Sequence, residues 1–192
     1  MARFMGPRFK LARHLGVNVF GHPKALNRGV KQHKLSEYGE QLLEKQKLRA
    51  YYGVLEKQFK KIVFNALKSK EKSEDILVQS LERRLDNLVY RLGFGSTLRE
   101  ARQMVSHGHI LVNGQKVDIP SYKVNIGDEV SLRSKSRKIQ TYASNFTTII
   151  PAVTYIEKDT ESFSGRLIRL PKSVEVPVRV KYSKVLEFYS KN

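Results

Sequence analysis

The sequence contains no cysteine, and it also lacks a long apolar run. Without cysteine the chain cannot form disulfide bonds, thiolate nucleophiles or zinc sites with cysteine ligands. No stretch of 18 apolar residues is present, so no segment is expected to span a membrane. The N-terminus also lacks the apolar core of a secretory signal. We therefore expect an intracellular protein that needs no metal and no cofactor, with an organellar compartment left open.

Acidic residues are scarce. The 192 residues include 36 Lys and Arg but only 18 Asp and Glu, which gives a formal net charge of +18. A charge this large repels itself unless a polyanion neutralises it. The balance therefore favours a nucleic-acid-binding protein over a protein of an anionic membrane surface. The length suits one or two domains with a sizeable core.

Acidic residues are missing altogether from the first 34 positions. Glycine and proline interrupt this segment, and no apolar period is sustained in it. A basic segment of this kind is typically disordered alone and becomes ordered on a partner. Its candidate contacts to nucleic acid are Arg3, Arg8, Lys10 and Arg13.

Apolar residues recur at helical spacing in the next three segments. The pattern predicts helices at 36–51, 55–67 and 73–92. The first helix is basic, and its candidate binding residues are Lys45, Gln46, Lys47 and Arg49. In the third helix Glu82 and Asp86 lie one turn apart and are flanked by arginines. This arrangement indicates ion pairs on a solvated helix face rather than acid–base catalysis.

A helix followed by a hairpin is predicted between residues 93 and 119. Thr97 and Glu100 fit a helix capping box. The apolar face of the helix is expected to contain Leu98, Ala101 and Val105. Gly108 can end the helix, and Asn113-Gly114 is a strong signal for a two-residue hairpin turn.

The other side of this helix–hairpin unit is polar and basic. Forked arginine donors suit phosphate oxygens, and histidine or asparagine can reach sugars and base edges. We expect this side to bind nucleic acid, with an ordinary solvated helix face as the alternative. The candidate binding residues are Arg99, Arg102, Gln103, His107, His109, Asn113 and Lys116, followed by Tyr122 and Lys123. A second basic cluster contains Arg133, Lys135, Arg137 and Lys138.

The remaining patterns predict short elements. They are strands at 122–124 and 129–132, a short helix through 142–146, strands at 153–156 and 166–170, and a C-terminal helix at 182–189.

No catalytic constellation is present in the sequence. His22 stands where a phosphate-binding loop would need lysine, and Gly93-Phe94-Gly95 does not follow a strand. His107 and His109 lack a third metal ligand nearby. We therefore expect a binding protein rather than an enzyme.

A long ordered run from Leu85 to Tyr122 resembles the signature of a known family, the bacterial-type fourth small-subunit ribosomal protein (uS4 family). The matching parts include Leu85–Phe94, Ala101-Arg102-Gln103, His107–Ile110, Val112-Asn113-Gly114 and Val117–Tyr122. The resemblance extends over essentially the whole chain. Many members bind zinc through four N-terminal cysteines, but Phe9 and Ala12 hold the first two of those positions here. The chain is thus similar to cysteine-free members.

The resemblance implies an α+β fold in which an α-helical domain is interrupted by an RNA-binding domain of helices beside a small antiparallel sheet. The implied division is a basic extension at 1–35, a helical domain at 36–80 completed by 171–192, and an RNA-binding domain at 81–170. The implied role is to bind the 5′ domain of small-subunit rRNA, nucleate subunit assembly and contribute to decoding accuracy. The implied partners are that rRNA, other small-subunit proteins, notably the fifth, and mRNA along its path into the ribosome.

Two other functions are compatible with parts of the sequence. Helices at 76–92 and 97–107 could form a helix-turn-helix of a DNA-binding regulator, although the basic charge is spread over the whole chain. The RNA-binding module could also belong to an RNA-modifying factor, although no catalytic domain is left over. Sedimentation with small ribosomal subunits would separate these alternatives from the first.

Overall fold

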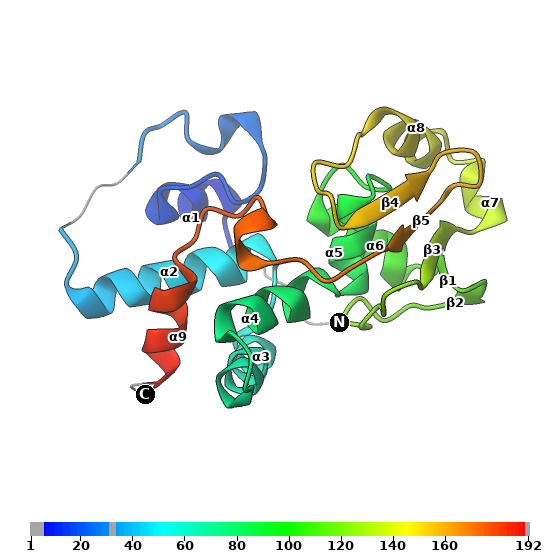
Figure 1. The fold of residues 1–192 in the computed structure, drawn as a ribbon. Helices are drawn as coiled ribbons and strands as arrows, with labels where there is room; N and C mark the ends of the chain where they lie inside the picture. Colours follow the sequence, from blue (N-terminus) through cyan, green and yellow to red (C-terminus); the bar gives the residue numbers. More distant parts are fainter. Residues whose placement is uncertain (1–5, 31–33, 191–192) are drawn as a thin grey trace. The chain divides into compact units, whose positions relative to one another are not determined.

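The structure, a computed structural model, describes residues 6–30 and 34–190. It divides the chain into two compact units. One unit contains the described residues up to Leu77 together with those from Val178 onward, and the other is Val78–Pro177 (Figure 1). The second unit is therefore inserted into the sequence of the first.

The first unit is helical. Its elements are α1 (Arg8–Leu15), the 3-10 helix η1 (Pro23–Ala25), α2 (Glu37–Tyr51), α3 (Glu56–Lys68), the start of α4 (Ser73–Glu82) and α9 (Tyr182–Ser190). The hydroxyl of Ser36 caps α2 by accepting a hydrogen bond from the Gly39 amide at 3.2 Å. α9 packs on α2 and α3, so the end of the chain completes this unit (Figure 1). The helices predicted at 36–51, 55–67 and 182–189 are confirmed.

The acid-free N-terminal segment buries apolar side chains against α2. Leu15 and Val19 are buried in one cluster with Ala50 of α2, and Ala12 and Ala25 are fully buried. Apolar side chains of residues 6–30 are therefore buried despite the missing period, and ordering of the segment on a nucleic-acid partner stays a prediction. A helix of two turns followed by irregular chain is too short to show a period, even when its apolar residues are buried.

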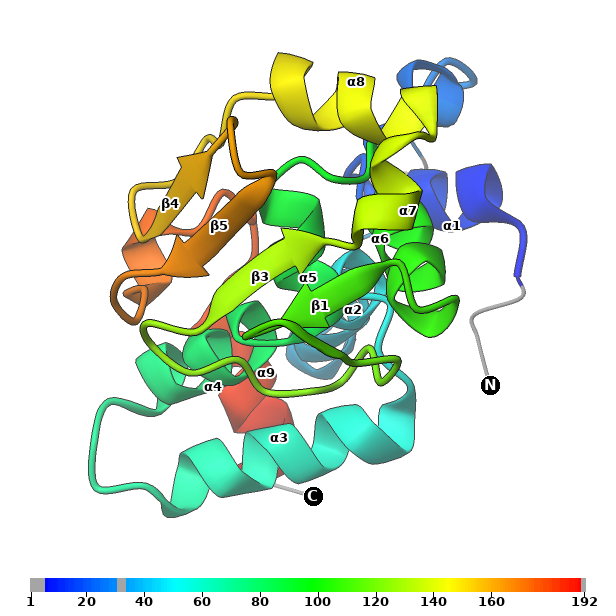
Figure 2. The same cartoon turned by 90° about the vertical axis from the view of Figure 1, so that its right-hand side faces the viewer.

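The second unit combines helices with one antiparallel sheet. Its helices are α5 (Leu85–Arg91), α6 (Leu98–Ser106), α7 (Ser134–Arg137), α8 (Gln140–Thr148) and the 3-10 helix η2 (Ser173–Glu175). Its strands are β1 (Ile110–Val112), β2 (Gln115–Lys116), β3 (Glu129–Leu132), β4 (Ile156–Asp159) and β5 (Ser164–Leu167). The strand order is β2-β1-β3-β5-β4, and α5 and α6 lie on one side of the sheet (Figure 2). The α+β class is confirmed.

The predicted helix at 73–92 is wrong, because the chain breaks between α4 and α5. Arg84 is extended, with φ −66° and ψ 136°, and it forms an isolated antiparallel bridge with Lys123. The Leu85 amide donates to the carbonyl of Tyr122 at 2.9 Å. The expected strand at 122–124 is reduced to this bridge. The apolar spacing continues unbroken through the turn, so periodicity alone could not reveal it.

The last two strands lie closer together than predicted. The sequence favours 153–156 and 166–170, but β4 and β5 meet through a turn after Asp159. The Asp159 carboxylate accepts hydrogen bonds from the Glu161 amide and the Ser162 hydroxyl, at 3.0 and 2.6 Å. Phe163 then takes a positive φ of 53°. β4 lies at an edge of the sheet and carries charged residues, so no continuous apolar run marks it in the sequence.

Candidate nucleic-acid interface

The start of α6 is held by hydrogen bonds and close packing. The Thr97 hydroxyl accepts from the Glu100 amide at 3.2 Å, as the predicted capping box requires. The Glu100 carboxylate, however, accepts from the amide and hydroxyl of Ser96, both at 2.7 Å, rather than from the Thr97 amide. A Cβ added at Gly95 would lie 2.9 Å from the Ala101 nitrogen. The helix therefore begins directly against the backbone of the preceding turn.

The exposed side of α6 carries three of the predicted binding residues. Arg99, Gln103 and His107 follow one another at four-residue spacing, and all three are exposed. The buried side contains Ala101, Val105 and also Met104, which was missing from the predicted apolar face. We call Arg99, Gln103 and His107 the outer row of α6.

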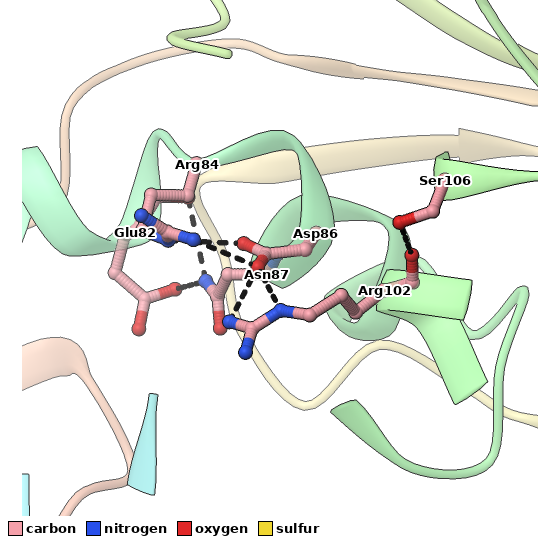
Figure 3. A network of polar contacts seen from close by, with 6 residues as sticks. All are labelled: Glu82, Arg84, Asp86, Asn87, Arg102 and Ser106. Carbon is pink, nitrogen blue, oxygen red and sulfur yellow. Dashed lines mark hydrogen bonds and ion pairs between the residues drawn. The ribbon is translucent and has the colours of Figure 1, made fainter. Parts of the chain in front are cut away.

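Arg102 does not belong to this outer row, because its guanidinium group is bound to Asp86. The Nε atom of Arg102 donates to Asp86 Oδ2 at 2.8 Å, and its Nη2 lies 2.6 Å from the same oxygen (Figure 3). The Asp86 side chain is fully buried, and the Arg102 side chain keeps 19% of its exposure. The structure thus shows Arg102 in an ion pair within the protein. Its contact with phosphate stays a prediction.

Asp86 is the acceptor for a second arginine as well. Arg84 donates from Nε and Nη2 to the two carboxylate oxygens at 3.0 and 2.9 Å, and the Asn87 amide donates at 2.9 Å. Five N–H groups converge on one buried carboxylate. The shared carboxylate links the bridge at Arg84, the start of α5 and the middle of α6 (Figure 3).

Glu82 forms a similar buried cluster next to the first. It accepts from Arg91 Nη2 at 2.8 Å, from Asn87 Nδ2 at 2.6 Å and from the Tyr155 hydroxyl at 2.8 Å. Both acids are 0% exposed, so the prediction that Glu82 and Asp86 pair on a solvated face is wrong. The break before α5 turns both carboxylates into the interior, where buried charges need partners.

Asn113 closes the hairpin and binds the neighbouring turn. It has a φ of 49° and Gly114 a φ of 76°, as a type I′ turn requires. Its side-chain oxygen accepts from the Glu129 amide at 2.9 Å, and its Nδ2 donates to Asp128 Oδ1 at 2.9 Å. Both ends of the amide therefore have partners within the protein, so the observed role of Asn113 is structural.

His109 lies at the end of this surface in a half-buried position. Its Nδ1 is 2.9 Å from the Ser136 hydroxyl, and its ring meets Tyr142 edge-on with centroids 5.3 Å apart. Burial lowers the pKa of His109, and electrostatic interactions with His107 and Arg133 lower it further. His109 is therefore mostly neutral at neutral pH, since an ordinary histidine titrates near about 6.5.

Exposed lysines and arginines surround these residues. Lys116 of β2 and Lys123 are exposed, and the stem of Lys116 covers Gly108. The Tyr122 side chain is half-buried, and the backbone carbonyl of Tyr122 accepts the hydrogen bond from the Leu85 amide at the start of α5. Arg133 joins the surface because its amide donates to the His109 carbonyl at 2.9 Å. The sequence predicts a basic cluster that contains Arg133 but does not assign this cluster to the site. The pairing of β1 with β3 brings Arg133 beside His109, and that pairing could not be read from the local sequence.

The predicted binding residues of α2 are largely engaged within the helical unit. Lys45 Nζ lies 3.0 Å from Glu56 Oε1 and 4.5 Å from the ring centre of Phe188. Arg49 is 2.7 Å from the same Glu56 carboxylate. Lys47 pairs with Glu44 at 2.7 Å. Gln46 is half-buried.

The Glu56 carboxylate also accepts from the Tyr189 hydroxyl at 2.6 Å. Burial raises the pKa of Glu56, but the hydrogen bonds from Tyr189, Lys45 and Arg49 outweigh it and leave the pKa below its ordinary value. Burial and the bond to Glu56 raise the pKa of Tyr189.

The N-terminal candidates differ from those of α2. Arg8 and Lys10 are exposed on α1, and Arg13 Nε donates to the Phe9 carbonyl at 3.3 Å. Arg3 lies outside the described residues. Across residues 6–30 and 34–190, no cluster of three or more His, Asp or Glu side chains could hold a metal ion. In the same ranges, no helix is both long and apolar enough to cross a membrane.

A polar helix face beside a hairpin, in a chain with a net charge of +18, defines a nucleic-acid-binding protein of the α+β class. Comparison with known families gives the particular kind. Residues 3–82 match the ribosomal protein S4/S9 N-terminal domain, and residues 83–130 match the S4 domain.

Full-length relatives agree with these matches. Proteins named small ribosomal subunit protein uS4 are 51% identical in Finegoldia magna and 49% identical in Aquifex aeolicus, in each case over 100% of both chains. The protein of that name from Persephonella marina is 46% identical over 99% of this chain and 100% of its own. The chain belongs to the uS4 family of small ribosomal subunit proteins, and it is a cysteine-free member. This is a family of ribosomal structural proteins, not of enzymes, so the regulator and the modifying factor are not favoured.

Proposed function

We propose that this protein binds the 5′ domain of small-subunit rRNA, where it nucleates subunit assembly and contributes to decoding accuracy. Family membership supports the role in the small subunit. The observation that carries the site is the outer row of α6, which presents Arg99, Gln103 and His107 on one exposed helix face. Lys116, whose stem lies against Gly108, and Arg133, whose amide donates to the His109 carbonyl, add positive charge beside that face, and Lys123 is exposed in the same unit.

The proposed contacts divide by their chemistry. Arg99, Lys116 and Lys123 are suited to phosphate oxygens, which position the RNA without reading its sequence. Gln103 and His107 can bind sugar hydroxyls or base edges, which single-stranded or junction regions expose. Arg102 and Asn113 contribute chiefly by fixing α6 and the hairpin. We further propose that the fifth small-subunit protein and the incoming mRNA are partners, on the family resemblance alone.

A salt titration on a fragment of the 5′ domain tests the proposed face. Log K should fall by roughly 0.7–0.9 per neutralised phosphate for each decade of salt. Arg99→Gln should weaken binding and make this slope shallower by about one phosphate. The matched control is Lys70→Gln, because Lys70 is exposed in the loop between α3 and α4. If Arg99→Gln and Lys70→Gln both bind like the unaltered protein, the interface lies elsewhere.

A further inference from the structure

A basic cavity lies in the N-terminal segment, in the helical unit. Its volume is about 360 Å³, within the range of roughly 300–1,000 Å³ that is usual for small-ligand sites. The residues that line it are Phe9, Arg13, Lys24, Ala25, Asn27 and Arg28. Three of these side chains are cationic and none is acidic. A cavity of this volume is too small for a duplex and is on the scale of one small ligand.

The walls of the cavity are fixed by contacts within the segment. The ring of Phe9 packs on the ring of His22, with centroids 4.9 Å apart. His22 Nδ1 accepts from the Lys24 amide at 3.1 Å, and Asn18 Nδ2 donates to the His22 carbonyl at 3.0 Å. Ala25, which also lines the cavity, is fully buried. The cavity is therefore formed before any ligand arrives, which lowers the entropic cost of binding.

The positive charge of the cavity is not compensated by acids. Residues 6–30 contain no Asp or Glu, and no ion pair in the described part of the chain involves Arg13, Lys24 or Arg28. The cations of α2 differ, because Glu44 and Glu56 neutralise them. Three uncompensated charges around one concave site create a positive potential that attracts an anion.

The geometry points to an RNA nucleotide, turned out of its strand, as the ligand of this cavity. This proposal rests on the proposed function, and it narrows the contacts predicted for the N-terminal segment, Arg13 among them, to a site for one nucleotide outside the outer row of α6. The guanidinium groups of Arg13 and Arg28 and the Lys24 ammonium bind the phosphate. Phe9 supplies an aromatic surface against which a base packs, and the Asn27 amide can both donate to and accept from a base edge.

Chemical-shift titration of the full-length protein tests the proposal with three probes: inorganic phosphate, uridine 5′-monophosphate and a single-stranded hexamer of uridines. The amides of Lys24, Asn27 and Arg28 should shift with the hexamer, less with the monophosphate, and least with phosphate. Arg28→Gln should weaken binding of all three, and because Arg28 is exposed this variant should fold normally. Phe9→Leu should weaken binding of the hexamer about fivefold or more and leave binding of phosphate unchanged. Lys70→Gln is the matched control and should change nothing.

Two results would overturn the proposal. The hexamer could leave these amides unshifted at concentrations that saturate the outer row of α6. Alternatively, phosphate could bind as tightly as the hexamer with no effect of Phe9→Leu, which would indicate a bare anion site. Either result, with normal binding of the 5′-domain fragment, rejects the cavity and leaves the proposed function standing. Loss of fragment binding by the unaltered protein would instead reject the proposed function.

Discussion

Replacing Asp86 with asparagine should destabilise the second unit strongly. The change keeps the shape of the side chain but removes the charge that two arginines share. Arg84 and Arg102 keep only 7% and 19% of their side-chain exposure, so water cannot replace the lost carboxylate. Removing one partner from a buried ion pair typically costs about 3–5 kcal/mol. This is a large part of the roughly 5–15 kcal/mol that stabilises an ordinary domain.

The same structure predicts a smaller cost for Arg102→Ala. Asp86 then keeps both hydrogen bonds from Arg84 and the one from the Asn87 amide. The loss is that of hydrogen bonds to a charged group, about 1.5–3 kcal/mol. In the double variant Arg102 is absent, so Asp86→Asn leaves one fewer buried arginine without its carboxylate. The loss of unfolding free energy in the double variant should therefore be smaller than the sum of the losses in the two single variants.

Urea denaturation of the three variants measures these free energies of unfolding. Asp118→Asn is the matched control, because Asp118 is an exposed acid of the same unit. A cost below about 1 kcal/mol for Asp86→Asn, or strict additivity in the double variant, would refute the shared buried carboxylate. RNA binding adds a second readout. If Arg102 only positions α6, Arg102→Ala lowers affinity without changing the salt slope, whereas a phosphate contact would make that slope shallower.

Three further predictions follow from individual contacts. Because the folded pKa of His109 is lowered, folding stability should fall as the pH drops below about 6.5, and His109→Gln should remove this dependence in thermal melts. The folded pKa of Glu56 is also lowered, so its contribution is present above about pH 4.3 and is lost as the pH falls through the folded value. Glu56→Gln should therefore destabilise at pH 7 more than at pH 3. Asn113→Ala should lower the free energy of unfolding in urea by about 1–3 kcal/mol. Asn113→Gly should restore only the part of this loss that comes from the positive φ, because glycine cannot make the side-chain hydrogen bonds.

The parts that could be predicted depend on neighbours in sequence. The cap at Thr97, the stop at Gly108 and the turn at Asn113-Gly114 involve residues within a few positions of each other. The sequence patterns that predict them are therefore local, and the structure confirms the predicted helix and hairpin between 97 and 116. The spacing of Arg99, Gln103 and His107 on one face follows from the same helix.

The break between α4 and α5 depends on residues far away in sequence. The amides of Leu85 and Asp86 donate to the carbonyls of Tyr122 and Pro120, more than 30 positions later. No glycine or proline marks the break, and arginine is a good helix former. The pairing of Arg102 with Asp86 depends on this break, so the sequence could not separate Arg102 from the exposed candidates.

The positions of the acids decide which cations are available to bind RNA. Glu44 and Glu56 neutralise the basic face of α2, and Asp86 holds the arginine nearest to the outer row of α6. Lys116, Lys123 and Arg28 are exposed, and none of the ion pairs found in residues 6–30 and 34–190 involves them. Counting basic residues therefore identifies a polyanion-binding protein but not its contacts. In the folded chain, the ion pairs of Lys45, Lys47, Arg49 and Arg102 show which of the predicted contacts the protein already uses for its own packing.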